Sequence, residues 1–325
     1  MKIIHIILSK GFSGSEKYVV DLINIQSLKH ECFLIINKKN NYYEKYCQIN
    51  KKIKIIKISN FLSFLLINLS LNIIRPQIVH THLGDASKKV IKRKFFKLIS
   101  TLHMNFKKKY YKNHDGLIVS NETKKIEINN KLKCAVKKIY LWPCSNDIEN
   151  TVSISDLKKR YEIEKNDFIF GSIGRFHYQK GFDILQKVFK EISNKKIYLF
   201  LIGNDHDKFN HYKSKNIITL PFQKNTAQFY KLFDCFIMSS RWETFGMTLI
   251  EAMQNKLPII TTVHEGNQDW IKNYNVDIFN INNHSELKNL VDKRFKLGKQ
   301  KINYDLTIFN KIDRCREIQD FYNEI

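Results

Sequence analysis

Short apolar runs separated by segments of helical character recur along the whole chain and narrow the folds open to it. The predicted strands of the first half are Lys2–Leu8, Glu31–Asn37, Ile53–Ile58, Gln77–His82, Lys97–Leu102 and Gly116–Ser120. Those of the second half are Phe168–Ile173, Ile197–Ile202, Ile217–Leu220, Cys235–Met238 and Pro258–Thr261. Helical segments such as Ser15–Leu28 and Asn121–Leu132 lie between them. This alternation predicts two α/β domains of the Rossmann-like kind, each with a parallel sheet.

The length of the chain allows two such domains. Its 325 residues and 38.7 kDa suffice for two separate cores. Polar and acidic residues replace the periodic pattern at 145–155, so we expect one domain at 1–150 and another at 151–305. The end of the chain, 306–325, has helical character again.

Neither a membrane span nor a signal peptide is predicted. The longest apolar run, Phe61–Ile74, contains Ser and Asn residues and falls short of the roughly 20 residues that cross a bilayer. We expect a buried or interfacial helix there. Met1–Leu8 lacks the core and cleavage site of a signal peptide, and the six cysteines have no metal-site or Cys-x-x-Cys spacing. A cytoplasmic protein without structural metal or disulfides is expected.

Positive charge is concentrated in the first half of the chain. Residues 1–150 contain 28 Lys and Arg against 10 Asp and Glu, whereas residues 151–325 contain 27 against 21. Lys88–Lys112 is rich in lysine, lacks acids and includes Phe95, Phe96, Phe106, Tyr110 and Tyr111. We favour an anionic membrane surface or anionic acceptor as the partner, with these aromatic rings at the headgroup boundary. A solvated face stays open as an alternative, and nucleic acid is not expected because no nucleic-acid-binding motif accompanies the patch.

The segment Ser239–Met253 places two carboxylates eight residues apart around a strand-to-helix turn. Gly246 lies at the turn, where free backbone N–H groups and the positive end of the helix dipole can hold an anion or a sugar oxygen. Glu243 on the loop can accept hydrogen bonds from sugar hydroxyls, and Glu251 on the helix can bind vicinal hydroxyls such as those of ribose. The spacing alone would equally suit two surface glutamates.

A second cluster of charge follows the first strand of the second half. The segment Gly171–Asp183 contains Gly174, Arg175 and Lys180. A guanidinium and an ammonium group together suit a diphosphate whose charge grows as it leaves. The alternative is a solvated pair of cations at the start of a helix.

Two weaker candidates lie in the first half. Gly14, in a loop between the first strand and a helix, would let a phosphate or sugar approach the backbone, although Ser13 or Ser15 in the same loop could simply cap the helix. His103 ends a predicted strand, where a lone histidine is more often a hydrogen-bonded structural residue than a catalyst. His80 and His82 are expected to serve packing.

The Ser239–Met253 segment resembles the Glu-x7-Glu signature of the retaining glycosyltransferases of family 4, which have the GT-B architecture. The Gly174-Arg175 and Lys180-Gly181 pairs and the loop before Glu16 are similar to other motifs of that family. The chain departs from the family where Ser13 and Glu265 stand for glycines. It also departs at Trp142–Asp147, which stands where the family has Pro-Asn-Gly and lacks both Asn and Gly at those places.

The resemblance implies two Rossmann-like domains with a cleft between them and a final helix that crosses back to the first domain. The first domain would bind the acceptor and the second the nucleotide-sugar. It implies catalytic roles for Arg175, Lys180, Glu243 and His103. It implies donor binding by Gly14, Gly174, Arg175, Lys180, Glu243, Thr244, Phe245, Gly246 and Glu251.

The implied activity is a retaining, metal-independent hexosyl transfer from a nucleoside-diphosphate sugar, with UDP-sugars favoured, and without a cofactor. The acceptor would be a hydroxyl of a glycan or glycolipid, as in bacterial surface polysaccharide or lipopolysaccharide synthesis. A peripheral position on the inner face of the cytoplasmic membrane would suit a lipid-linked acceptor. The alternatives are a nucleotide-sugar 2-epimerase of the same fold and a non-catalytic basic protein that binds membrane or nucleic acid.

Overall fold

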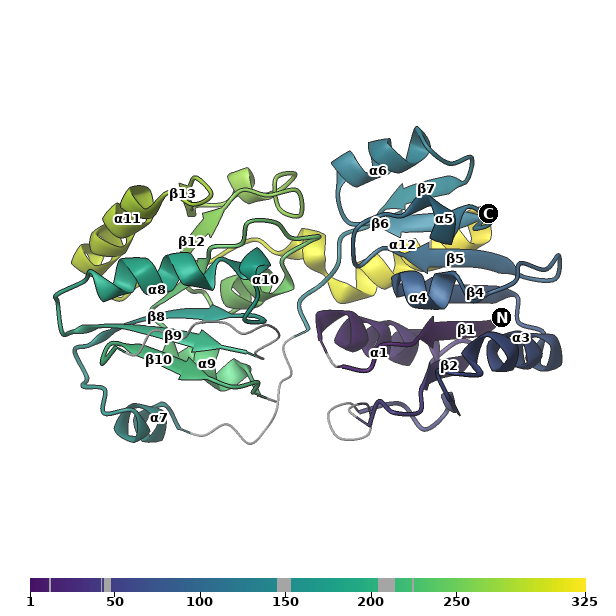
Figure 1. Cartoon of the computed structure of the whole chain (residues 1–325), viewed down its shortest axis with the longest axis horizontal. Coiled ribbons are helices and arrows are strands. Elements are labelled where there is room, and N and C mark those ends of the chain that lie inside the picture. Colours follow the sequence, from purple (N-terminus) through teal and green to yellow (C-terminus); the bar gives the residue numbers. More distant parts are fainter. Residues whose placement is uncertain (12, 42, 44–47, 145–152, 204–213, 224) are drawn as a thin grey trace. The chain divides into compact units, whose positions relative to one another are not determined.

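The computed structural model describes residues 1–11, 13–41, 43, 48–144, 153–203, 214–223 and 225–325. The chain divides into two units, one of Met1–Cys144 with Ile308–Ile325 and one of Ser145–Thr307 (Figure 1). The first unit thus ends a few residues before the boundary expected at 150. Most of the predicted joining segment 145–155 lies outside the described residues.

The first unit contains a parallel sheet in the order β3-β2-β1-β4-β5-β6-β7. Its strands are β1 Lys2–Ile7, β2 Glu31–Asn37, β3 Lys54–Ile58, β4 Ile78–His82, β5 Lys97–Thr101, β6 Gly116–Val119 and β7 Ala135–Lys138. The chain moves outward from β1 to β3 and then returns to β4 on the other side of β1. The point between β1 and β4 is therefore a topological switch, where loops open a crevice at the carboxyl ends of the strands.

Helices cover both faces of this sheet. They are α1 Gly14–Gln26, α3 Ser63–Ile74, α4 Leu83–Ser87, α5 Lys108–Tyr111, α6 Glu122–Asn129 and α12 Lys311–Glu324. On one face, Ile67 and Leu71 of α3 pack with Ile4, Ile6 and Val79 of the sheet. The other face includes α12, whose Tyr322 bonds to Gln26 of α1 and His80 of β4. The predicted return of the final helix to the first domain is confirmed (Figure 1).

The second unit contains a parallel sheet in the order β10-β9-β8-β11-β12-β13. Its strands are β8 Phe168–Ile173, β9 Ile197–Ile202, β10 Ile217–Leu220, β11 Cys235–Met238, β12 Ile259–Thr262 and β13 Asp277–Phe279. Its helices are α7 Ile154–Arg160, α8 Phe182–Lys190, α9 Ala227–Leu232, α10 Met247–Gln254 and α11 His284–Leu297. The switch point here lies between β8 and β11.

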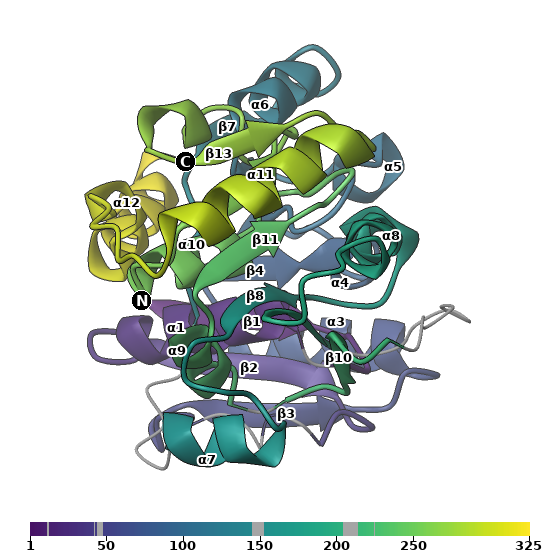
Figure 2. The same cartoon turned by 90° about the vertical axis from the view of Figure 1, so that its left-hand side faces the viewer.

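Aromatic and aliphatic side chains on alternate positions of these strands fill the core of the second unit. Phe168 and Phe170 of β8 pack against Leu185 and Phe189 of α8, and Leu287 of α11 joins them. Figure 2 shows α8 and α11 within this unit. The opposite face of the sheet holds Phe200 and Phe236, which lie against Phe233 and Tyr230 respectively.

The predicted strands are confirmed to within one residue at their ends, and two further strands were missed. Both, β7 and β13, are outermost in their sheets. β7 is half-exposed and ends in two lysines, and β13 has three residues. Such short edge strands lack the continuous apolar run that marks a strand buried on both faces. No helix among the described residues has the length and apolarity to cross a membrane.

Replacing Tyr322 with Phe should lower the free energy of unfolding of the first unit by about 1–3 kcal/mol. The hydroxyl lies 2.5 Å from His80 Nδ1 and 3.3 Å from Gln26 Nε2, so its loss leaves buried polar atoms without a partner. Urea titration, with amide hydrogen exchange in β1 and β4 as the readout, measures the change in the free energy of unfolding. Tyr110→Phe, on a ring that is only partly buried, is the matched control and should stay within about 0.5 kcal/mol of the parent. Equal effects of the two substitutions would contradict this account of α12.

Candidate functional site

The loops that follow β8 and β11 meet at the switch point of the second unit. After β8 the chain passes Gly174 and Arg175 and enters a single 3-10 turn, Tyr178–Lys180, which His177 caps through its Nδ1, 3.1 Å from Gln179 N. Gly174 lies against the side chain of Lys180, because a Cβ there would be 3.2 Å from Lys180 Cε. Lys180 therefore extends along the backbone of the loop toward the neighbouring strand.

Lys180 and Glu243 form an ion pair at this point. Their side chains are 15% and 10% exposed, and Ser240 Oγ donates to Glu243 Oε1 at 2.9 Å. Gln179 connects the pair to its surroundings: its Nε2 lies 3.4 Å from Glu243 Oε2, and its Oε1 lies 3.4 Å from Arg175 Nη2. The structure thus brings together Arg175, Lys180 and Glu243, which the sequence analysis had selected separately. Gln179 and Ser240 were missed, since neither belongs to a charged pattern.

Glu243 is ionised near neutral pH in this environment. Burial by itself raises the pKa of the carboxyl, but the charge of Lys180 and the hydrogen bonds from Lys180 and Ser240 outweigh it, so the pKa lies below its usual value. His264 lies nearby, and burial lowers the pKa of its ring to about 4. Among the described residues neither ring nitrogen of His264 has a hydrogen-bond partner, which leaves two buried polar atoms available to a ligand or water.

The loop after β11 leads directly into the N-terminus of α10. Gly246 adopts φ 95°, a left-handed conformation that suits glycine, and precedes the first residue of the helix. Gly266 packs so closely on this loop that a Cβ would lie 2.5 Å from Phe245 N. A close backbone approach is thus retained beside Glu265. The ring of Phe245 is buried, so a ligand would meet Thr244 and Phe245 chiefly through their backbone.

Glu251 lies one turn into α10 and is 6% exposed. The hydroxyl of Tyr230, from α9, donates to Glu251 Oε2 at 2.8 Å. Burial and the adjacent carboxylate raise the pKa of Tyr230 well above its usual value, which keeps the phenol as a donor. Arg241 supports the same loop from the other side through two bonds to Asp183, at 2.8 and 2.7 Å. Tyr230 and the Arg241–Asp183 pair were also missed, because their roles depend on contacts distant in sequence.

The two candidates of the first unit lie near its own switch point. Gly14 is the first residue of α1, after a loop in which Ser13 N and Ser13 Oγ both donate to Glu16 Oε2 at 2.7 Å. His103 follows β5 and ends a chain of histidines that begins at Gln26 (Gln26–His5–His82–His103). The successive distances are 2.7, 3.0 and 3.2 Å.

The direction of this chain determines which nitrogen of His103 can accept a hydrogen bond. Gln26 donates its Nε2–H toward Tyr322, so its Oε1 accepts from His5 Nε2. His5 Nδ1 then accepts from His82, and His82 Nδ1 accepts from His103 Nε2. Burial lowers the pKa of His103 to about 3, so the ring is neutral near pH 7. His103 therefore presents Nδ1 as an acceptor.

His5, His80 and His82 form a group whose nitrogen atoms lie within 4.8 Å of one another, close enough to suggest a metal site. Their ring planes argue against one. The His80 and His82 rings stack with centroids 4.3 Å apart, and His5 stacks on His82, so in-plane lone pairs do not converge on one point. All six ring nitrogens also make the hydrogen bonds described above or bond to Thr101. The group is a hydrogen-bonded network rather than a metal centre.

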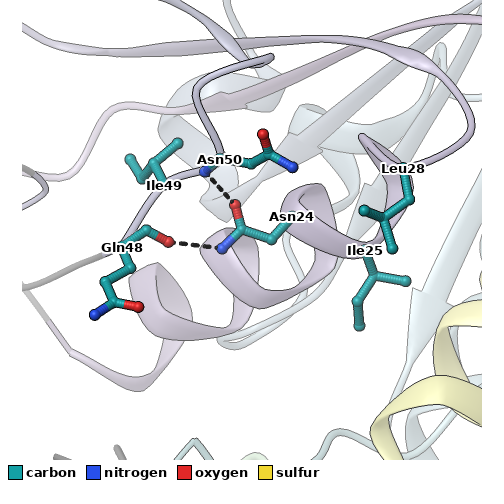
Figure 3. A pocket seen from close by; sticks show the side chains of 6 residues that line it. All are labelled: Asn24, Ile25, Leu28, Gln48, Ile49 and Asn50. Atoms are coloured by element: carbon teal, nitrogen blue, oxygen red, sulfur yellow. Dashed lines mark hydrogen bonds between the residues drawn. The ribbon is translucent and has the colours of Figure 1, made fainter.

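A shallow pocket on the first unit contains none of the predicted site residues. Its lining consists of Asn24, Ile25, Leu28, Gln48, Ile49 and Asn50 (Figure 3). Asn24 holds the two sides together, because its Nδ2 donates to Gln48 O and its Oδ1 accepts from Asn50 N. This lining has no ionisable side chain, so the pocket offers little for catalysis.

The family model described as glycosyl transferases group 1 matches residues 153–304, which include every candidate of the second unit. The similarity to this family therefore lies within the second unit.

Curated relatives and solved structures agree with this assignment. An uncharacterized glycosyltransferase of Methanocaldococcus jannaschii is 33% identical over 167 residues, which cover 48% of this chain and 41% of the relative. The chain thus spans less than half of that protein. A UDP-Gal:alpha-D-GlcNAc-diphosphoundecaprenol alpha-1,3-galactosyltransferase of Escherichia coli is 26% identical over 270 residues, or 76% of this chain and 69% of the relative. The structure of Anabaena Alr3699/HepE with UDP matches all of both chains with a TM-score of 0.78 at 16% identity, and the predicted GT-B fold is confirmed.

We expect the first unit to lose stability as the pH falls below the ordinary histidine pKa of 6.5. Burial lowers the pKa of His5 to about 4 and those of His80 and His82 well below their usual value, so only the unfolded chain binds protons there between pH 6.5 and about 4. The stabilisation is complete above pH 6.5 and declines on acidification, by up to about 1.4 kcal/mol per pH unit for each ring. Urea unfolding at several pH values, followed by hydrogen exchange in β1 and β4, measures it. His5→Leu should reduce the change in unfolding free energy per pH unit. An unchanged pH dependence would contradict the assignment of this effect to the buried histidines.

Proposed function

We propose that this chain is a retaining glycosyltransferase of the family 4 type that takes a sugar from a nucleoside-diphosphate donor, with UDP-sugars favoured. The observation that carries the proposal is the cluster at the switch point of the second unit. There a buried carboxylate for sugar hydroxyls, two cations for phosphate and the N-terminus of α10 lie together. This combination of groups suits a diphosphate joined to a sugar.

The diphosphate would bind at the N-terminus of α10, with Arg175 and Lys180 as its cations and Gly174 and Gly246 allowing a close approach. Three observations support this position. The helix α10 begins at Met247, directly after Gly246, and the first N–H groups of a helix lack an acceptor four residues earlier in the helix. Lys180 is already held beside this loop by Glu243, and the orphan nitrogens of His264 lie behind it. A Cβ at Gly246 would be 3.7 Å from His264 Cε1.

The sugar and the ribose would be bound by different carboxylates. Glu243, ionised and fixed by Ser240, would accept hydrogen bonds from sugar hydroxyls. Glu251, fixed by Tyr230, would bind the vicinal hydroxyls of the ribose. Within the first unit, His103 is proposed to offer Nδ1 as a hydrogen-bond acceptor to a sugar hydroxyl, and Gly14 to allow a ligand to approach the backbone closely.

The chemistry that follows from these groups is departure of the diphosphate on the same face as the incoming hydroxyl. Negative charge grows on the leaving phosphate, and Arg175, Lys180 and the α10 dipole stabilise it most strongly at that moment. Glu243 is engaged by Lys180, Ser240 and Gln179, so it suits hydrogen bonding to hydroxyls better than attack on the sugar carbon. An oxocarbenium-like front-face displacement is therefore proposed, without divalent metal or cofactor.

The acceptor is proposed to be a hydroxyl of a glycan or lipid-linked glycan in the synthesis of a bacterial surface polysaccharide or lipopolysaccharide, on the cytoplasmic side of the membrane. The Escherichia coli relative supports this choice, because its name specifies a diphosphoundecaprenol-linked acceptor. The matched part of that relative extends over both units of the present chain.

A panel of UDP-, GDP-, ADP- and CMP-sugars tests the donor. A UDP-sugar should raise the melting temperature most, since a ligand that binds only the folded state stabilises it. With a lipid-linked glycan acceptor the same donor should yield a glycosylated lipid and UDP, in EDTA as well as without it. An EDTA-treated reaction that only magnesium or manganese restores would refute metal independence. A 2-epimerised UDP-sugar formed without acceptor would indicate an epimerase, and failure of every donor to bind would leave a non-catalytic protein.

Arg175→Ala and Lys180→Ala should each lower kcat by on the order of a hundredfold, because each removes a charge that acts on the leaving diphosphate. Lys187→Ala, at an exposed position of α8, is the matched control and should retain full activity. Steady-state kinetics with the donor from the panel measures the effect, with melting curves to show that each variant is folded. Normal kcat in either site variant would remove that residue from the proposed mechanism.

A further inference from the structure

The helix α3 has apolar side chains on two opposite sides, yet the protein covers only one of them. The sequence Ser63–Ile74 contains no charged residue, and its polar residues are Ser63, Asn68, Ser70 and Asn72. Ser63, Ile67 and Leu71 form the buried stripe that faces the sheet. A helix with apolar residues on both sides is normally enclosed on both or placed against a non-aqueous phase. The outer side of α3 therefore calls for a partner.

The exposed side of α3 forms a continuous apolar stripe. Phe61, Leu65, Leu69 and Ile73 recur at intervals of four residues and are 94%, 61%, 51% and 72% exposed. They lie two residues out of step with the buried stripe, which places them on the opposite side of the helix. Leu62 and Phe64 widen the stripe, at 46% and 52% exposure. Phe61 and Leu62 lie in the turn just before α3, and the other four residues lie on the helix. Six large apolar side chains gathered on one short segment exceed the scattered exposure usual for a protein surface.

Basic residues lie along one side of α3 and at its C-terminal end. Asn68 of α3 bonds to Lys89 O and Ile91 N, so the start of the lysine-rich segment runs along the helix. Lys88, Arg93 and Lys94 in that segment are exposed, as is Arg75 at the C-terminal end of α3. Residues 45–114 contain sixteen Lys and Arg and one acid, Asp85. The apolar stripe is thus bordered by positive charge.

We propose that α3 lies in the interface of an anionic lipid bilayer, with its exposed stripe among the upper acyl chains and the surrounding bases on the headgroups. An amphipathic surface with apolar side chains on one side and Lys or Arg at its border suits this position. A second copy of the chain fits less well, because pairing through α3 would bring two strongly basic surfaces together. The proposal concerns attachment and is independent of the sugar chemistry.

The structure also changes which residues would enter the lipid. The sequence analysis assigned that role to the aromatic residues of Lys88–Lys112. Phe96 and Tyr111 are instead buried, and Phe95, Phe106 and Tyr110 pack against the core of the first unit. That part of the expectation is wrong: these rings hold the basic segment to the fold, and the apolar contact belongs to α3.

Sedimentation of the full chain with vesicles tests the proposal without donor or acceptor. We expect binding to vesicles of phosphatidylcholine and phosphatidylglycerol at about 0.1 M salt, weak binding to phosphatidylcholine alone, and decline as salt rises. Leu65→Gln with Leu69→Gln should lower the affinity about tenfold or more. The matched control is Leu28→Gln with Ile126→Gln, which alters exposed apolar residues elsewhere in the first unit and should bind as the parent does.

Further experiments distinguish the contribution of charge from that of apolar contact. They also distinguish a lipid bilayer from a second copy of the chain as the partner of α3. Replacing Lys107, Lys108, Lys109 and Lys112 with Gln should weaken the salt-sensitive part of binding, whereas the α3 double variant should weaken binding at every salt concentration. Equal loss in the α3 and control pairs, or equal binding to neutral and anionic vesicles, would overturn the proposal. A dimer in sedimentation velocity that the α3 pair abolishes, without vesicle binding, would assign the stripe to a second copy instead. Melting curves and hydrogen exchange in β1 and β4 of the first unit show that each variant is folded.

Discussion

Parallel pairing of the strands within each sheet determines where the chemical groups of this protein gather. Every carboxyl end lies at the same edge, and the chain leaves the central strand in one direction before it returns on the other side. In the second unit this order makes β8 and β11 neighbours in the sheet, although 61 residues, which include β9 and β10, lie between the end of β8 and the start of β11 in the sequence. Lys180 after β8 consequently meets Glu243 after β11.

The same topology serves the first unit differently. There β1 and β4 are neighbours, and their register sets His5 beside His80 and two residue pairs away from His82. The result is a network of neutral rings held by Gln26 and Tyr322, which leads to His103. A buried charged group thus marks the switch point of one unit, and a chain of uncharged donors and acceptors marks that of the other.

Several of these features lower stability. A buried ion pair loses hydration that its mutual attraction only partly restores, and His264 has orphan nitrogens among the described residues. The exposed stripe of α3 leaves apolar area in water. Such departures from ordinary packing rules are typical of surfaces that await a ligand or partner. They occur at the proposed donor site and at the proposed lipid contact.

The sequence by itself determined the α/β class, the central strands and the charged members of the site, because strands buried on both faces require continuous apolar runs and phosphate or sugar sites require particular side chains. It did not reveal the edge strands β7 and β13, because the first is half-exposed and ends in two lysines and the second has only three residues. Only the tertiary structure decided that Gln179 and Tyr230 hold the charged residues in place, since these contacts join segments far apart in the chain. The contact of Ser240 with Glu243 is local, but it depends on the conformation of the loop after β11. It likewise decided that the aromatic rings of Lys88–Lys112 face inward while α3 faces outward, because the direction of an apolar side chain depends on which neighbouring surface is available to cover it.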